Sequence, residues 1–150
     1  PARFQLVGAM NLCPCGARGD GAAQCSCTAD RISRYREKLS RALLDRFDLL
    51  LTVPRPRAVA LAGAPGEASA PVRERVLSAR RQLRERLPAR TGAADELLTR
   101  AVERLPLSGR GRARVARVAE TIAALAEAGA VEAEHVGEAL SYRPPAELTG

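Results

Sequence analysis

Residues 4–10 read FQLVGAM and residues 43–53 read LLDRFDLLLTV. These two stretches decide the fold, because each contains a continuous apolar run of the length of a buried strand. We predict strands over Arg3–Met10 and Leu49–Val53, the second of which ends at Pro54. Apolar runs without alternation are typical of parallel strands that are covered on both faces. The sequence therefore predicts part of an α/β fold in this region.

The rest of the sequence has the periodicity of helices. Between the two predicted strands, a cap at Thr28 or Asp30 opens a helix whose apolar residues continue to Leu43 at spacings of three and four. Beyond Pro71 the pattern becomes wholly helical, and Pro88 ends the first helix there. The four helices expected in this region cover residues 72–87, 94–105, 109–128 and 132–142.

Composition divides the chain into two parts. Residues 54–70 contain three prolines, two glycines and several alanines, which is typical of a linker. We therefore predict an α/β part over residues 1–53, a linker over 54–70 and an all-α four-helix domain over 71–150. A strand that begins at residue 3 needs neighbours, so we expect the chain to be a piece of a longer protein.

The net charge of the chain is +7, from 24 basic and 17 acidic residues. Residues 1–53 and residues 71–150 each carry a net +3, so the charge is spread out. This pattern fits either ordinary solvated faces or an anion-binding surface. No apolar run has the roughly 20 residues of a membrane span, and no signal peptide is visible in residues 1–20. We therefore expect a cytoplasmic protein without a membrane partner.

Four cysteines form two C-x-C pairs, Cys13 with Cys15 and Cys25 with Cys27. The nine residues between the pairs include three glycines, which let the backbone fold back and bring the pairs together. Four thiolates close a tetrahedral structural zinc site, and we interpret the cysteines as its ligands. Disulfides and unrelated thiols are the alternatives, and the missing secretory signal counts against disulfides.

Two polar residues lie next to the predicted strands. Asn11 follows the first strand, where open α/β sheets place ligands, although asparagine is also common in plain turns. Arg46 lies just before the second strand. It fits either a contact with a phosphoryl group on a neighbouring subunit or an ion pair with Asp45 or Asp48 of its own chain.

A third candidate, Arg110, lies behind Ser108 in the first turn of a predicted helix. The N-terminus of a helix favours anions, but a solvated basic turn has the same sequence. The lone histidine, His135, is interpreted as surface or core filler and not as a ligand or base. Catalytic triads, paired carboxylates and the phosphate-binding G-x-x-x-x-G-K-[ST] motif are missing from these 150 residues.

Together these segments resemble the C-terminal part of the magnesium-chelatase-like AAA+ ATPases of the YifB/ComM type. The resemblance covers nearly the whole chain, and the cysteine segment followed by LLDRFDL is its most specific part. The stretches that carry it are FQLVGAMNLCPCG at 4–16, the two cysteine pairs, RYREKLSRALLDRFDLLLTV at 34–53, LSGRGRARVARVAETIAAL at 107–125 and EHVGEALSYR at 134–143.

The resemblance implies the C-terminal portion of an AAA+ nucleotide-binding core with a zinc knuckle, followed by a helical lid domain. Asn11 matches the sensor-1 asparagine, which helps to position the attacking water. Arg46 matches the arginine finger, which completes the ATP site of the next subunit in trans. Arg110 matches the sensor-2 arginine, which binds the phosphates. The cysteines match the family's own C-x-C pairs, which supports a structural Zn²⁺ site.

The resemblance also implies the activity of the longer protein. The family forms ring-shaped, hexameric ATPases that use ATP and Mg²⁺, and its ComM branch is similar to DNA helicases that drive branch migration during competence. The Walker A and Walker B motifs belong upstream and do not occur in this sequence. Phosphoryl transfer needs both motifs, so we expect this fragment alone neither to bind ATP tightly nor to hydrolyse it.

Two other functions remain open at this point. One is a zinc-stapled nucleic-acid-binding module that acts without ATP. An aromatic content of 3% counts against it, because stacking platforms for single strands need aromatic side chains. The other is a magnesium-chelatase-type regulatory subunit, which would act on metal insertion into a tetrapyrrole.

Overall fold

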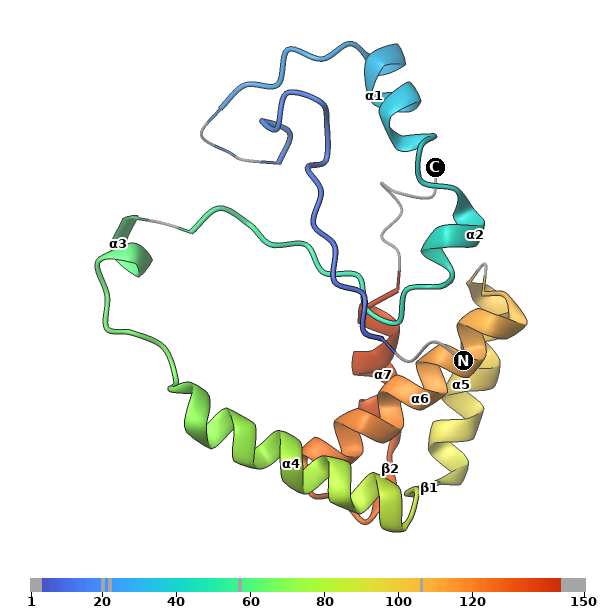
Figure 1. Ribbon diagram of the computed structural model, residues 1–150. Helices are drawn as coiled ribbons and strands as arrows, with labels where there is room; N and C mark the ends of the chain where they lie inside the picture. The colour runs from blue at the N-terminus through green and yellow to red at the C-terminus, as the bar shows by residue number, and fades with distance from the viewer. Residues whose placement is uncertain (1–3, 20, 22, 57, 106, 144–150) are drawn as a thin grey trace. The chain divides into compact units, whose positions relative to one another are not determined.

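The computed structural model describes residues 4–19, 21, 23–56, 58–105 and 107–143 (Figure 1). The chain divides into two compact units. Unit 1 takes its residues from 1–40 and 52–62, and unit 2 takes its residues from 41–51 and 63–150. Among the described residues, no helix has both the length and the apolar character that crossing a membrane requires.

Unit 1 contains two short helices, α1 (Ala29–Arg36) and α3 (Ala58–Leu61). The Oγ1 of Thr28 accepts a hydrogen bond from the backbone N–H of Arg31 at 3.3 Å, which confirms Thr28 as a helix cap. The predicted helix does not run on to Leu43. The amide of Leu39 bonds to the carbonyl of Arg36 in a tight turn, and a separate helix, α2 (Arg41–Leu44), follows in unit 2.

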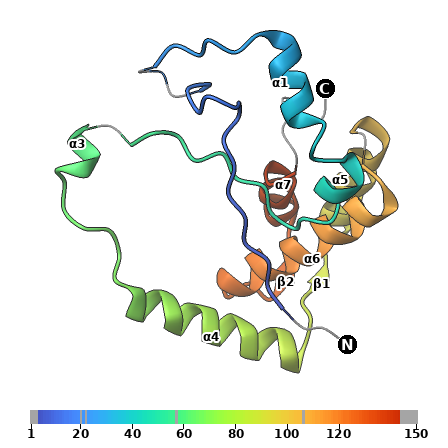
Figure 2. The ribbon, with the colours of Figure 1, turned by 45° about the horizontal axis from the view of Figure 1, so that its top comes forward.

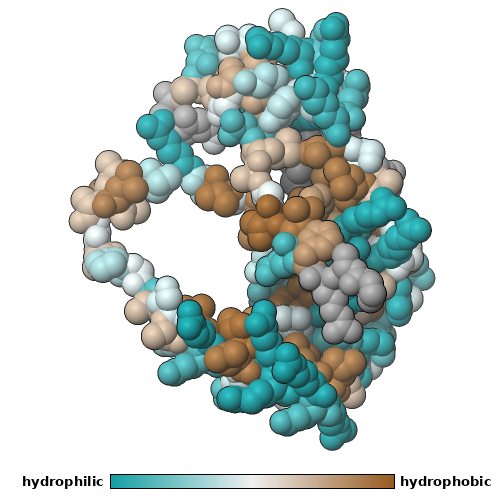
Figure 3. All heavy atoms as spheres, viewed as in Figure 1, coloured by the Kyte–Doolittle hydropathy of each residue, from teal (hydrophilic) through white to brown (hydrophobic). Residues whose placement is uncertain are grey.

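The two predicted strands are wrong for this structure. Residues 4–10 and 49–53 have no strand structure, and Arg3 lies outside the described residues. Phe4 and Val53 are 78% and 85% exposed. A strand is held by backbone hydrogen bonds to a neighbouring strand, and no described segment pairs with either run. Helix α3 also exposes apolar residues, and its hydrophobic atoms are visible at the left of Figure 3.

The sheet that does form lies in unit 2 and is small. Strand β1 (Ala89–Arg90) pairs in parallel with β2 (Ala130–Val131), with Ala89 opposite Ala130 and Arg90 opposite Val131. The amide of Thr91 extends the pairing with a 3.0 Å hydrogen bond to the carbonyl of Val131. This sheet was not predicted, because two-residue strands have no periodicity that a sequence pattern can detect.

Four longer helices make up most of the described part of unit 2, and they lie close to the predicted positions (Figure 1). Helix α4 spans Ser69–Glu85, α5 Gly92–Arg104, α6 Gly109–Leu125 and α7 Ala133–Ser141. Helix α4 ends before Pro88, as expected for a residue that cannot continue a helix. The Oγ atoms of Thr91 and Ser108 cap α5 and α6 by accepting hydrogen bonds from Ala94 and Gly111.

The core of unit 2 lies between α5, α6 and α7, and Figure 2 shows these helices close together. Helix α4 packs on α6 from the other side. Small side chains fill much of the core, which lets the helices approach closely. Its buried residues are Ala94, Leu98, Val115, Val118, Ala119, Ala123, Val131, Val136 and Ala139.

His135 has a structural role at the start of α7. It is buried, and its Nδ1 accepts a hydrogen bond from the backbone N–H of Glu132 at 2.9 Å. In return, the Glu132 side chain accepts from the backbone of His135, which completes a capping box. The histidine is therefore a capping residue in the core, which agrees with its interpretation as filler.

We predict that Leu98→Ala lowers the free energy of unfolding of unit 2 by about 2–5 kcal/mol, because it leaves a cavity in a packed core. Leu98 of α5 is fully buried, whereas Leu125 of α6 is 42% exposed, so Leu125→Ala is the matched control with a smaller expected effect. The measurement is urea unfolding followed by circular dichroism. Equal losses in the two variants would contradict this core.

Candidate functional site

The four cysteines of unit 1 form one cluster, in which all the sulfur atoms lie within 4.8 Å of one another. The Sγ of Cys13 lies 3.3 Å from that of Cys15 and 3.6 Å from that of Cys25, and the Sγ atoms of Cys15 and Cys25 are 3.7 Å apart. Four thiolates around one zinc at 2.3 Å would be separated by about 3.8 Å. No disulfide joins these cysteines, and their sulfur atoms lie close enough together to hold one metal ion.

Glycines shape the loop that brings the two cysteine pairs together. Gly16, Gly19 and Gly21 all have positive φ angles, of 80°, 83° and 68°. Side chains rarely tolerate this conformation, so glycine is needed for the reversal of the chain. The amide of Gly16 bonds to the carbonyl of Cys13 at 3.1 Å, and the amide of Arg18 points to the Cys13 sulfur at 3.4 Å. Backbone donors thus face a thiol, as they do in sites that stabilise thiolates.

The thiols of the cluster differ in pKa. A hydrogen bond with the backbone of Ala17, together with bonds to Cys13 and Cys27, lowers the pKa of Cys15 to about 6. At Cys25 a hydrogen bond with the backbone of Cys27 lowers the pKa, but burial and bonds to the other three thiols outweigh it and raise the pKa to about 11. Thiolates this close together repel one another, so the thiols do not all ionise readily. A bound cation would offset that repulsion.

Asn11 lies at the edge of the cysteine loop. Its side chain is exposed, and a Cβ built on Gly16 would lie 3.4 Å from the Asn11 Nδ2. The strand that was expected to position Asn11 is missing from the described residues. Asn11 belongs to unit 1, whereas Arg46 and Arg110 both belong to unit 2.

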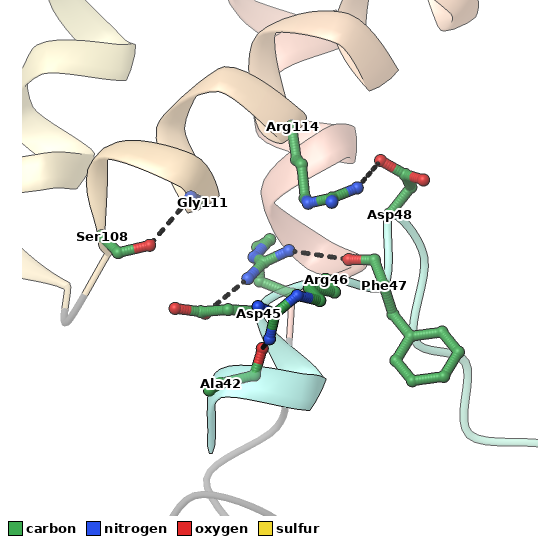
Figure 4. A network of polar contacts seen from close by, with 9 residues as sticks. Ala42, Asp45, Arg46, Phe47, Asp48, Ser108, Gly111 and Arg114 are labelled. Carbon is green, nitrogen blue, oxygen red and sulfur yellow. Dashed lines mark hydrogen bonds and ion pairs between the residues drawn. The ribbon is translucent and has the colours of Figure 1, made fainter. Parts of the chain in front are cut away.

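Arg46 lies two residues beyond α2 and is exposed (Figure 4). Its Nη1 donates a hydrogen bond to the carbonyl oxygen of Ala42 at 2.8 Å. The carboxylates of Asp45 and Asp48 bind other arginines. The intrachain ion pair considered for Arg46 is therefore not formed, and its guanidinium remains accessible.

The residues on both sides of Arg46 are held by two arginines of the helices. Arg143, which follows α7, forms an ion pair with Asp45 at 3.1 Å and donates to the carbonyl of Phe47 at 3.2 Å. Arg114 of α6 forms an ion pair with Asp48 (Figure 4). Sequence reasoning missed both arginines, because 98 and 66 residues separate them from their aspartates and no local pattern marks such a pair.

Arg110 occupies the first turn of α6, as predicted, and is exposed. It forms no ion pair with any other residue in the described part of the chain. The Ser108 Oγ caps the same turn through the amide of Gly111 at 3.0 Å. Gly111 is buried, and a Cβ there would lie 3.6 Å from the Nη2 of Arg143. The first turn of the helix that carries Arg110 thus lies near the arginine that holds the Arg46 segment.

Comparison with known proteins identifies two family matches. Residues 1–61 match the family described as magnesium chelatase, subunit ChlI, and residues 89–143 match magnesium chelatase, subunit ChlI C-terminal. Over 95% of its length the chain is 37% identical to the uncharacterized protein YifB of Escherichia coli and 36% identical to the competence protein ComM of Haemophilus influenzae. It is also 40% identical to an uncharacterized protein of Mycobacterium tuberculosis. The chain spans 31–32% of the lengths of these relatives.

We predict that Cys15 reacts first with iodoacetamide in chain that has been freed of metal. Its pKa of about 6 leaves the thiol mostly ionised at pH 7, and the thiolate is the nucleophile. Lowering the pH from 7 to 5 should reduce this rate about tenfold, because the thiolate fraction falls through the pKa. Cys25, with a pKa of about 11, should react slowest.

Mass spectrometry of the alkylated peptides over time measures each rate, and Cys15→Ser serves as the control for assignment. Equal rates at all four cysteines, or a Cys15 rate that does not depend on pH between 5 and 7, would contradict the geometry of the cluster.

Proposed function

The chain belongs to the magnesium chelatase, subunit ChlI, family, and we propose that it supplies the sensors, the arginine finger and the lid of an AAA+ motor subunit. The chain is a fragment of an AAA+-type protein, so ATP and Mg²⁺ would bind to the longer protein. In this proposal residues 1–53 complete the nucleotide-binding core, residues 54–70 are a linker and residues 71–150 are the lid.

The observation that carries the proposal is the exposure of Arg46 and the pairing of its neighbouring aspartates with other arginines. The two neighbouring aspartates are neutralised by Arg143 and Arg114, which leaves the Arg46 guanidinium exposed and without a carboxylate partner among the described residues. An arginine finger needs a permanent positive charge, exposure to the neighbouring subunit and a backbone segment that is held rigidly in place. Arg46 carries a permanent charge and is exposed, and the segment around it is held by two ion pairs, which supports the proposal.

Arg110 and Asn11 complete the proposed set. Arg110 stands in the first turn of a 17-residue helix, where the helix dipole and the free backbone N–H groups favour a phosphate. We assign it the sensor-2 role and assign Asn11 the sensor-1 role, both toward the nucleotide of their own subunit. Arg46 would stabilise the charge that develops on the γ-phosphate of the next subunit.

The cysteine cluster is proposed to hold one structural Zn²⁺. The donor set is four thiols whose sulfur atoms lie within 4.8 Å of one another, and zinc bound to four cysteines has no open position for substrate. Cys13, Cys15, Cys25 and Cys27 would be the ligands, and the ion would hold the loop closed. It would have no part in ATP hydrolysis.

The proposed partners follow from the trans role of Arg46. A finger that acts on a neighbour requires a homo-oligomer, and we propose a hexameric ring. One relative carries the name competence protein, and the chain has a net charge of +7, so we propose DNA as the substrate of the longer protein in the cytoplasm. Nucleotide-driven movement of the lid would then move the DNA, as in a helicase that drives branch migration.

We predict about one zinc per chain in protein purified without chelator, with all four thiols protected from a thiol reagent. Mass spectrometry of metals and a thiol titration before and after chelation measure both quantities. Each single Cys→Ser variant should lose most of the zinc, because three thiolates bind far more weakly than four. Free thiols and no metal in the folded chain would overturn the zinc proposal.

We predict that Arg46→Ala in the full-length protein lowers kcat for ATP hydrolysis about 10³-fold or more, the range for loss of an arginine finger. The KM for ATP should change little, since the residue acts on the transition state. Arg81→Ala, which removes another exposed arginine on α4, should leave both constants unchanged.

Mixing tests the trans action. Adding subunits whose own nucleotide site is disabled upstream, but which keep Arg46, should restore hydrolysis by Arg46→Ala subunits. A kcat close to that of the wild type in Arg46→Ala, or no restoration in mixed rings, would refute the assignment.

A further inference from the structure

The segment that carries Arg46 belongs structurally to the helices and not to its neighbours in sequence. Residues 41–51 form one unit with residues 63–150, while the residues before and after the segment belong to unit 1. The chain therefore leaves one unit, contributes eleven residues to the other and returns. For residues 41–51 to belong to unit 2, contacts must bind this segment to the helices.

Arg143 makes the central contact. Its side chain is only 8% exposed, and its two terminal nitrogens bind the residues on either side of Arg46. Nη2 lies 3.1 Å from the Asp45 carboxylate, and Nη1 donates to the carbonyl of Phe47 at 3.2 Å. A planar guanidinium with two separate partners restricts orientation as well as distance.

Two further contacts extend this attachment toward the end of the segment. Arg114 of α6 binds Asp48, and the backbone N–H of Leu50 donates to the carbonyl of Tyr142 at 2.9 Å. Side-chain and backbone contacts thus hold residues 45–50 along the ends of α6 and α7.

The same guanidinium also lies near the helix that carries Arg110. Its Nη2 lies 3.6 Å from where a Cβ on Gly111 would be, so a side chain at Gly111 would meet the guanidinium. Gly111 is adjacent to Arg110 in the sequence. One buried charge therefore binds the segment of the proposed finger and lies beside the turn of the proposed sensor.

Burial makes this contact sensitive to the loss of a partner. Desolvation lowers the pKa of Arg143, and the charges of Asp45 and Asp48 oppose that effect while Arg114 adds to it. A buried guanidinium that loses its carboxylate is left uncompensated beside another arginine. The attachment of the segment should therefore be strongly coupled to Arg143 and Asp45 together.

We propose that Arg143 is a positioning residue that, together with the Arg114–Asp48 ion pair, fixes the Arg46 segment beside helices α6 and α7, so that the arginine finger and the sensor-2 turn move as one body. This inference rests on the proposed function in one respect, namely that Arg46 is the finger. The attachment itself does not depend on that assignment and can be measured separately.

The first experiment measures the attachment by hydrogen exchange in the full-length protein. Arg143→Ala should raise the exchange rates of residues 45–50 at least tenfold, with the Leu50 amide as the reporter, while the amides of α5 stay protected. Arg143→Lys keeps the charge but loses the two-pronged geometry, so it should give an intermediate rate. Arg117→Ala, an exposed arginine of α6, is the matched control and should have no effect.

A double-mutant cycle tests the pair. Asp45→Asn and Arg143→Gln should each raise exchange in residues 45–50, and the double variant should be no worse than either alone, because both remove the same contact. Should Arg143→Ala fail to fold, Asp45→Asn and Arg143→Lys provide the same measurement. Unchanged exchange of residues 45–50 in these variants would overturn the inference.

The second experiment links the attachment to catalysis. Arg143→Ala should lower kcat for ATP hydrolysis at least tenfold with little change in KM for ATP, and Arg143→Lys should restore part of it. If Arg46→Ala leaves kcat unchanged, the proposed function fails, whatever Arg143 does. If Arg46→Ala abolishes hydrolysis but Arg143→Ala raises exchange without lowering kcat, the positioning role fails and the finger assignment stands.

Discussion

The pairing of the buried Arg143 guanidinium with Asp45 is the contact on which the placement of the Arg46 segment depends. It attaches residues 41–51 to helices that lie far away in the sequence, and it does so next to the residue proposed to act in trans. An ion pair in this position restricts geometry more than it adds stability, because burial of the charges offsets much of their attraction. Its value lies in holding Arg46 at a defined place while leaving its guanidinium exposed.

The described residues of the cysteine loop in unit 1 are not held by an ion pair or by an apolar core. The loop has almost no apolar core, since of its cysteines only Cys13 is fully buried. Three glycines with positive φ turn the backbone, and the four thiols converge into the candidate metal site. Small segments of this kind commonly gain their folding free energy from a metal ion, which is why metal content is informative about the whole unit.

The apolar runs at 4–10 and 49–53 show how a strand depends on its context. Their composition is that of buried strands, yet the described residues offer no neighbouring strand, and all the side chains except the half-buried Leu50 remain exposed. Helices form under the same conditions because their hydrogen bonds are internal to the segment. The difference explains why the helices of unit 2 were predicted within a few residues, while both strands were not observed.

The sequence by itself determined the features that depend on near neighbours. These include the caps at Thr28 and Ser108, the end of α4 before Pro88, and the spacing of cysteines and glycines that lets four thiols converge. Only the tertiary structure decided which residues meet across the chain. It paired β1 with β2, and it paired Asp45 and Asp48 with Arg143 and Arg114 instead of with Arg46. Such contacts join residues up to 98 positions apart, so no local pattern records them.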